Sequence, residues 1–91
     1  MLYRLRYPEE AERALRSAPG FYRQRFRQAI EGLASNPRPS EAKPMRDHNR
    51  YTLRFDQWRL IYSVRDDLGE VRILRIARKT GPETYEGLEG K

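Results

Sequence analysis

The spacing of the apolar residues changes once along this chain, and this change constrains the fold more than any other feature. In residues 9–33 apolar side chains recur every three or four positions, which predicts amphipathic helices. From residue 51 onward they form short runs rich in aromatic and β-branched residues, which predicts strands. Helices followed by a block of strands are typical of the α+β class.

Two helices are predicted in the first half of the chain. Pro8 suits the first turn of the first helix, and three glutamates follow it near the positive end of the helix dipole. This helix should end before Pro19-Gly20. The second helix should begin at Phe21 and end near Asn36-Pro37. Because only about two residues separate them, we expect the helices to form an antiparallel hairpin.

Four strands are predicted around these helices. They cover residues 2–7, 51–55, 58–64 and 71–77. Turns at 56–57 and 65–70 should join the last three as antiparallel hairpins, whereas residues 36–49, with three prolines, should be an irregular connection. The predicted order is β-α-α-β-β-β, with the helical hairpin packed on one face of a mostly antiparallel four-stranded sheet.

Length and composition limit what such a chain can be. Its 91 residues suffice for one core, so we expect a single domain over residues 1–91. It has no cysteine, which excludes disulfides and thiolate metal sites, and no metal-type cluster of carboxylates and histidines stands out. We expect no metal and no other cofactor. The first eight residues contain two arginines and no long apolar stretch, so we expect a cytoplasmic protein without membrane contacts.

The charge balance favours a polyanionic partner. The formal net charge is +6, and arginine supplies most of the positive charge. A guanidinium group binds phosphate in a bidentate manner and stacks on bases, which favours RNA as the partner. Two alternatives remain open, namely a solvated basic surface without a ligand and the arginine preference of a GC-rich or thermophilic genome.

Arginines also occupy almost all of the polar positions of the last three predicted strands. These residues are Arg54, Arg59, Arg72 and Arg75. One face of the sheet should therefore be strongly cationic. In residues 58–64 the alternation places Arg59 on the face opposite Trp58 and Tyr62, so that Arg59 can point outward toward a groove. The alternative is an ordinary solvated arginine.

Two further segments contain candidate functional residues. Arg78-Lys79 and then Tyr85, at the end of the last strand, could clamp a phosphate and stack a base. Tyr85 could instead cap the core. His48, the only histidine, is a possible proton-transfer group, although its position between Asp47 and Asn49 is also typical of a surface turn.

The order of these segments resembles the RelE/ParE superfamily of toxins from type II toxin-antitoxin modules. The resemblance covers most of the chain. It rests on Pro8-Glu9-Glu10-Ala11, residues 29–39, residues 50–55 and 58–62, residues 71–76, Arg78-Lys79 and Tyr85. For the RelE branch, this similarity implies a ribosome-dependent, metal-free endoribonuclease that cuts mRNA. It also implies a cognate antitoxin as protein partner, with the ribosome and mRNA as targets.

The resemblance implies roles for individual residues. Arg59 matches the arginine that stabilises the phosphate, and Tyr85 matches the tyrosine that orients the substrate. Lys79, or alternatively Arg78, falls where the family has a basic residue near the leaving group. The family also implies a catalytic contribution from Arg54. The residues expected to assist RNA binding are Arg50, Thr52, Arg75 and Arg78.

The chain departs from the RelE pattern at two positions. Arg54 and Thr52 fall where well-known members have lysines, one of which is the proposed general base. Arginine is a poor base, so Arg54 should act electrostatically, and His48 is a speculative substitute. Two other functions therefore remain open: a ParE-like inhibitor of DNA gyrase and a catalytically degenerate module that only binds an antitoxin.

Overall fold

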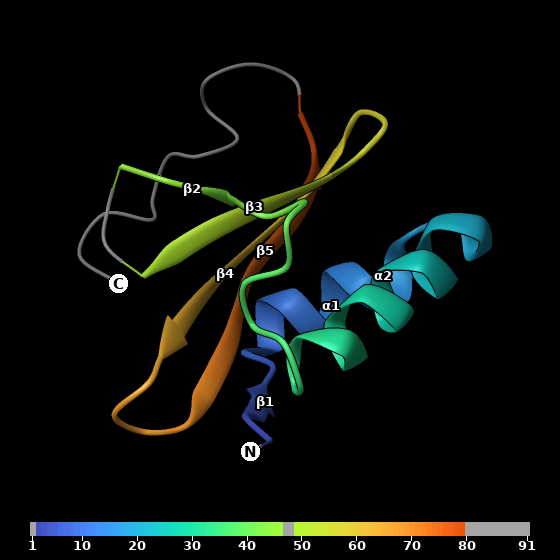
Figure 1. Cartoon of the computed structure of the whole chain (residues 1–91). Helices are drawn as coiled ribbons and strands as arrows, with labels where there is room; N and C mark the ends of the chain where they lie inside the picture. The colour runs from blue at the N-terminus through green and yellow to red at the C-terminus, as the bar shows by residue number, and fades with distance from the viewer. Residues whose placement is uncertain (1, 47–48, 80–91) are drawn as a thin grey trace.

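The elements follow the predicted order, with one additional strand. The computed structural model describes residues 2–46 and 49–79. The elements are β1 (Arg4–Arg6), α1 (Glu9–Ser17), α2 (Gly20–Leu33), β2 (Lys43–Pro44), β3 (Arg50–Phe55), β4 (Trp58–Arg65) and β5 (Glu70–Arg78). The α+β class and the predicted helices are confirmed (Figure 1).

The sheet has five strands rather than the predicted four, in the order β1-β5-β4-β3-β2. β1 is parallel to β5, and the other neighbours are antiparallel. The added strand β2 lies in the segment predicted to be irregular, where Lys43 pairs with Thr52 and Pro44 with Tyr51. Proline has no amide hydrogen to donate, and strands tolerate it mainly at sheet edges. A two-residue edge strand containing proline therefore leaves little signal in the sequence.

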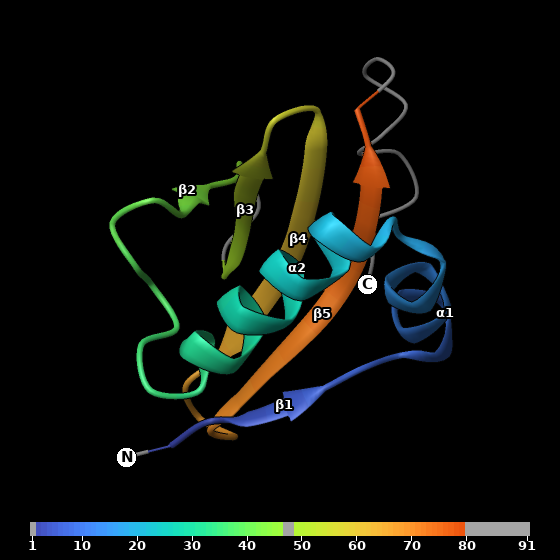
Figure 2. The same ribbon diagram turned by 90° about the vertical axis from the view of Figure 1, so that its right-hand side faces the viewer.

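The first strand is shorter than predicted, with three residues instead of residues 2–7. It lies at the edge of the sheet beside β5 (Figure 2). Because β5 begins only at Glu70, which pairs with Arg4, the residues before Arg4 have no strand partner. The amide of Tyr3 instead donates a hydrogen bond of 2.8 Å to the carbonyl of Ala34, after α2.

Both helices cover the same face of the sheet (Figure 1). Only Ala18 and Pro19 separate them, as predicted, and Figure 2 shows α1 nearly end-on while α2 runs across the sheet. Phe26, Ile30 and Leu33 of α2 are fully buried against apolar residues of β3, β4 and β5. Burial of each such side chain stabilises the fold by about 1.5–3 kcal/mol. Neither helix in the described part of the chain is long and apolar enough to span a membrane.

Candidate functional site

The face of the sheet away from the helices holds most of the predicted arginines. In β4, Leu60, Tyr62 and Val64 belong to the core beneath the helices. Arg59, directly before Leu60, lies on the opposite face, where it pairs with Arg54 of β3 on one side and with Ala77 of β5 on the other. The predicted division of β4 into an apolar and a cationic face therefore agrees with the structure.

A β-bulge in β5 decides which of its cations share this face. Ile61 pairs with Arg75 and Tyr62 with Ile73, so Leu74 has no partner opposite it. One extra residue reverses the alternation of faces beyond that point. Arg72 and Arg75, only three positions apart, therefore lie on the same face.

The bulge also decides which of the two adjacent cations at the end of β5 lies on the cationic face. Ala77 pairs with Arg59 on the cationic face, and Lys79 lines the groove on that face. Arg78 instead pairs with Trp58, whose ring packs against the core, and its Nη2 donates to Oε1 of Gln57 at 3.2 Å. The structure therefore brings Lys79 to the candidate site and directs Arg78 elsewhere.

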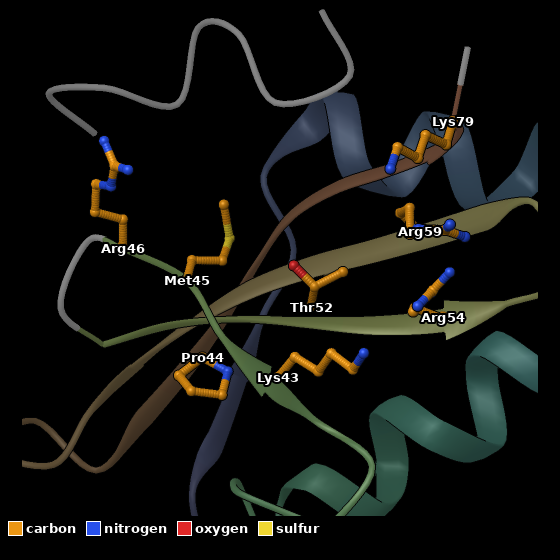
Figure 3. Close-up of a pocket in the computed structure, with 8 residues that line it drawn as sticks. All are labelled: Lys43, Pro44, Met45, Arg46, Thr52, Arg54, Arg59 and Lys79. Atoms are coloured by element: carbon orange, nitrogen blue, oxygen red, sulfur yellow. The ribbon is translucent and has the colours of Figure 1, made fainter. Parts of the chain in front are cut away.

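A groove of about 340 Å³ lies on the cationic face. The described residues that line it are Lys43, Pro44, Met45, Arg46, Thr52, Arg54, Arg59 and Lys79, and we call this the cationic groove. Figure 3 shows Lys43, Arg54 and Lys79 directing their charged ends toward the Arg59 end of the groove, with Arg46 at the other end. Five of the eight side chains carry a positive charge, and none carries a negative one.

Arg59 forms part of the groove wall but does not extend into open solvent. The residue is only 5% exposed, and Nη1 donates hydrogen bonds to the carbonyls of Asp56 (2.8 Å) and Trp58 (2.9 Å). Arg59 therefore lines a groove on this face, as expected, but it is not the ordinary solvated arginine of the alternative, because the carbonyls of Asp56 and Trp58 hold one side of its guanidinium group. Arg54, directly opposite, is exposed.

Only some of the other predicted site residues line the groove. Thr52 is buried and lines the groove. Arg50 and Arg75 lie on the same face, opposite Ser63 and Ile61, but do not line the groove. His48 and Tyr85 lie outside the described residues, so their predicted roles stay predictions.

Two of the positively charged residues that line the groove were not predicted from the sequence. Lys43 and Arg46 come from β2 and the residues directly after it. Their segment has no strand-like alternation, and their positive charge was the only signal that the sequence offered. They reach the groove because β2 pairs with β3 at Thr52.

This arrangement suits the binding of a polyanion. Like charges gathered over a partly buried surface raise the local positive potential and attract phosphate groups. Arg54, Arg59 and the two lysines could neutralise phosphate oxygens, whereas arginine is a poor proton acceptor. Among residues 2–46 and 49–79, histidines and carboxylates form no cluster that could hold a metal ion.

Solved structures with a similar fold include toxins and toxin-antitoxin complexes. A doubly substituted form of free Escherichia coli toxin RelE matches with a TM-score of 0.80 and 22% identity, over 93% of this chain and 92% of that chain. A chain of the archaeal RelE-RelB complex from Pyrococcus horikoshii matches with a TM-score of 0.74 and 27% identity, over 88% of this chain and 98% of that chain. The toxin-antitoxin complex RelBE2 from Mycobacterium tuberculosis contains a chain with a TM-score of 0.72 and 24% identity, over 87% and 100%.

These matches define the fold as that of the RelE toxins. The family model described as the ParE toxin of the type II toxin-antitoxin system parDE matches residues 5–80. The chain therefore belongs to the ParE toxin family, within the RelE/ParE superfamily that its sequence pattern predicted. No curated protein matches it.

Proposed function

We propose that this toxin is an endoribonuclease that cuts mRNA on the ribosome. The observation that carries the proposal is the cationic groove itself, in which cations from β2, β3, β4 and the end of β5 meet on one face. A surface of arginine and lysine without an opposing carboxylate suits the backbone of a single RNA strand. The expectation that cleavage takes place on the ribosome comes from the resemblance to the RelE branch.

The reaction needs only groups that RNA and a cationic protein provide. The 2′-oxygen of one nucleotide attacks the adjacent phosphorus, and the bond from phosphorus to the 5′-oxygen breaks. The products are a 2′,3′-cyclic phosphate and a 5′-hydroxyl group, so that one proton leaves the 2′-oxygen and one reaches the 5′-oxygen. Arg54 and Arg59 would neutralise the charge that develops on phosphate, Lys79 would serve the leaving group, and Tyr85 would orient the base.

A primer-extension assay on translating ribosomes tests this function. The wild-type protein should produce new message ends, while Arg59→Ala and Tyr85→Phe should greatly reduce them. Arg13→Ala is a matched control, because Arg13 lies on the surface of α1 and forms an ion pair of 2.7 Å with Glu9, away from the groove. Intact message with the wild-type protein would refute the proposal.

An antitoxin is the expected protein partner. The Mycobacterium tuberculosis relative was solved as a toxin-antitoxin complex, and the Pyrococcus horikoshii relative as a RelE-RelB complex. A net charge of +6 favours an acidic or amphipathic segment that orders as it binds. Copurification of the toxin with the product of a neighbouring gene would test this pairing.

A ParE-like inhibitor of DNA gyrase is the second candidate function. The match to the ParE model favours it, as does the arginine at position 54 in place of a potential base. A supercoiling assay separates the two, because a ribosome-directed nuclease should leave gyrase active. Overexpression without growth arrest would instead favour a degenerate antitoxin-binding module.

A further inference from the structure

The β3–β4 turn binds two residues of the cationic groove through its backbone carbonyls. The turn consists of Asp56 and Gln57, and Asp56 has a positive φ of 56°, a conformation that aspartate adopts more readily than most residues. The carbonyl of Asp56 accepts the hydrogen bond from Arg59 Nη1 at 2.8 Å. The carbonyl of Gln57 accepts one from the backbone amide of Lys79 at 2.7 Å. The position of the turn therefore affects both cations.

A tyrosine on the other side of the sheet anchors this turn. The hydroxyl of Tyr22, in the first turn of α2, donates a hydrogen bond of 2.7 Å to Oδ2 of Asp56. This hydrogen bond to a carboxylate raises the pKa of Tyr22 above its ordinary value. Arg25 Nη1 lies 3.9 Å from the same oxygen. The ring of Tyr22 packs against Trp58, with 5.8 Å between ring centroids, so the anchor is part of the aromatic core.

Arg59 needs such an anchor because of its neighbour. It lies directly opposite Arg54, and like charges at paired positions of a sheet repel each other. The carbonyls of Asp56 and Trp58 occupy one nitrogen of Arg59 and hold the group against this repulsion. Arginine has five N–H donors, so others can serve a phosphate.

We propose that Tyr22 and Asp56 are positioning residues for Arg59: the hydrogen bond between them fixes the β3–β4 turn, and the turn carbonyl fixes the guanidinium group in its phosphate-binding orientation. This inference rests on the proposed nuclease function for its consequence in catalysis. Neither residue lines the cationic groove, so neither is expected to contact RNA.

The chain contains a matched control for this pair. At another corner of the molecule, the hydroxyl of Tyr3 donates a hydrogen bond of 2.6 Å to Oδ1 of Asp66, and Arg38 binds the same carboxylate at 2.7 Å. The hydrogen bond from tyrosine to aspartate is of the same kind as that between Tyr22 and Asp56, and it raises the pKa of the tyrosine in both cases. The arginines differ, because Arg38 hydrogen-bonds its carboxylate whereas Arg25 lies 3.9 Å from Asp56. None of Tyr3, Asp66 and Arg38 lines the cationic groove. Tyr3→Phe therefore reports what the loss of such a hydrogen bond does to stability alone.

The first experiment measures kcat and KM of ribosome-bound mRNA cleavage for four variants. Tyr22→Phe and Asp56→Gly, in which glycine keeps the positive φ, should lower kcat by about 10-fold to 100-fold with KM changed less than about twofold. Asp56→Asn should retain most activity, because its amide oxygen accepts the same hydrogen bond. Tyr3→Phe should lower Tm about as much as Tyr22→Phe and leave kcat unchanged. Equal kcat for Tyr22→Phe and wild type, or equal losses for both tyrosine variants, would overturn the inference.

The second experiment does not depend on nuclease activity. Proton exchange and rotation of the Arg59 guanidinium group can be followed by ¹⁵N NMR in the free protein. We expect slow exchange in the wild type and in Tyr3→Phe, and clearly faster exchange in Tyr22→Phe. If the wild type does not cleave mRNA, the proposed function fails while this measurement still decides the positioning role. Unchanged Arg59 signals in Tyr22→Phe would refute that role.

Discussion

Arg54 and Arg59 lie directly opposite each other on neighbouring strands of the sheet. Two positive charges at paired positions destabilise a sheet, and the burial of Arg59 adds to this cost. The folded state tolerates this destabilisation because backbone carbonyls bind Arg59 and the aromatic core holds those carbonyls in place. We interpret the pair as a site in which stability is reduced in favour of anion binding.

Arg54→Thr should make the protein more stable and weaken its binding of RNA. Removal of the repulsion with Arg59 should raise the free energy of unfolding by about 0.2–1 kcal/mol. The loss of one phosphate contact should reduce the slope of log affinity against log salt by about 1. Urea denaturation followed by fluorescence of the single tryptophan, together with RNA titrations at several salt concentrations, measures both effects. A less stable variant with unchanged RNA affinity would contradict this interpretation.

Lys79→Arg should separate the effect of the positive charge at position 79 from the effect of proton transfer by this side chain. Arginine keeps the positive charge in the groove but does not release its proton near neutral pH. If Lys79 serves the leaving group, RNA affinity should stay near the wild-type value while the cleavage rate falls by about 100-fold. Single-turnover cleavage and equilibrium binding give the two values. A variant that cleaves like the wild type would limit Lys79 to an electrostatic role.

Phe26→Ala should destabilise the fold far more than Phe21→Ala, although both residues belong to α2. Phe26 is fully buried, and its ring contacts Phe55 at 5.0 Å and Trp58 at 5.6 Å between centroids. Truncation of a buried phenylalanine costs about 3–5 kcal/mol, enough to unfold a small domain. Phe21 is 66% exposed, so its truncation should cost less than about 1 kcal/mol. Thermal unfolding of both variants tests the contrast, which similar Tm losses would disprove.

Asp66→Asn should destabilise the protein at neutral pH but not in acid. Hydrogen bonds from Arg38 and then from Tyr3 hold the pKa of Asp66 below its ordinary value of 3.8. A carboxylate with a lowered pKa stabilises the fold above its unfolded pKa, and this contribution is lost as the pH falls through the folded pKa. The Tm difference between wild type and variant should therefore be present at pH 7 and vanish once the pH falls below the lowered pKa of Asp66. A difference that stays constant with pH would exclude this linkage.

The helices and the main strands could be predicted because their signals are local. Apolar spacing in residues 9–33 and in β3, β4 and β5 depends on neighbours within one element, and the structure confirms these elements within a few residues. The placement of Arg59 opposite the core also followed from alternation within a single strand.

Features that depend on contacts between distant segments could not be predicted. β2 forms only because β3 offers an edge to Lys43 and Pro44. The folded-back orientation of Arg59 depends on the turn at Asp56, and Tyr22, which holds that turn, precedes it by 34 residues. Residues that such contacts bring together have no spacing in the sequence that would reveal them.

The sequence alone determined the α+β class, the excess of positive charge and the gathering of arginines on the last three strands. The tertiary structure decided which of those cations meet. The bulge at Leu74 places Arg72 and Arg75 on one face and turns Lys79, rather than Arg78, toward the groove, and β2 adds Lys43 and Arg46. The physical reason is that side chains alternate between the two faces of a sheet at every residue. One unpaired residue in a strand therefore moves every later side chain of that strand to the opposite face. Strand pairing, which only the folded chain establishes, determines where such a residue lies.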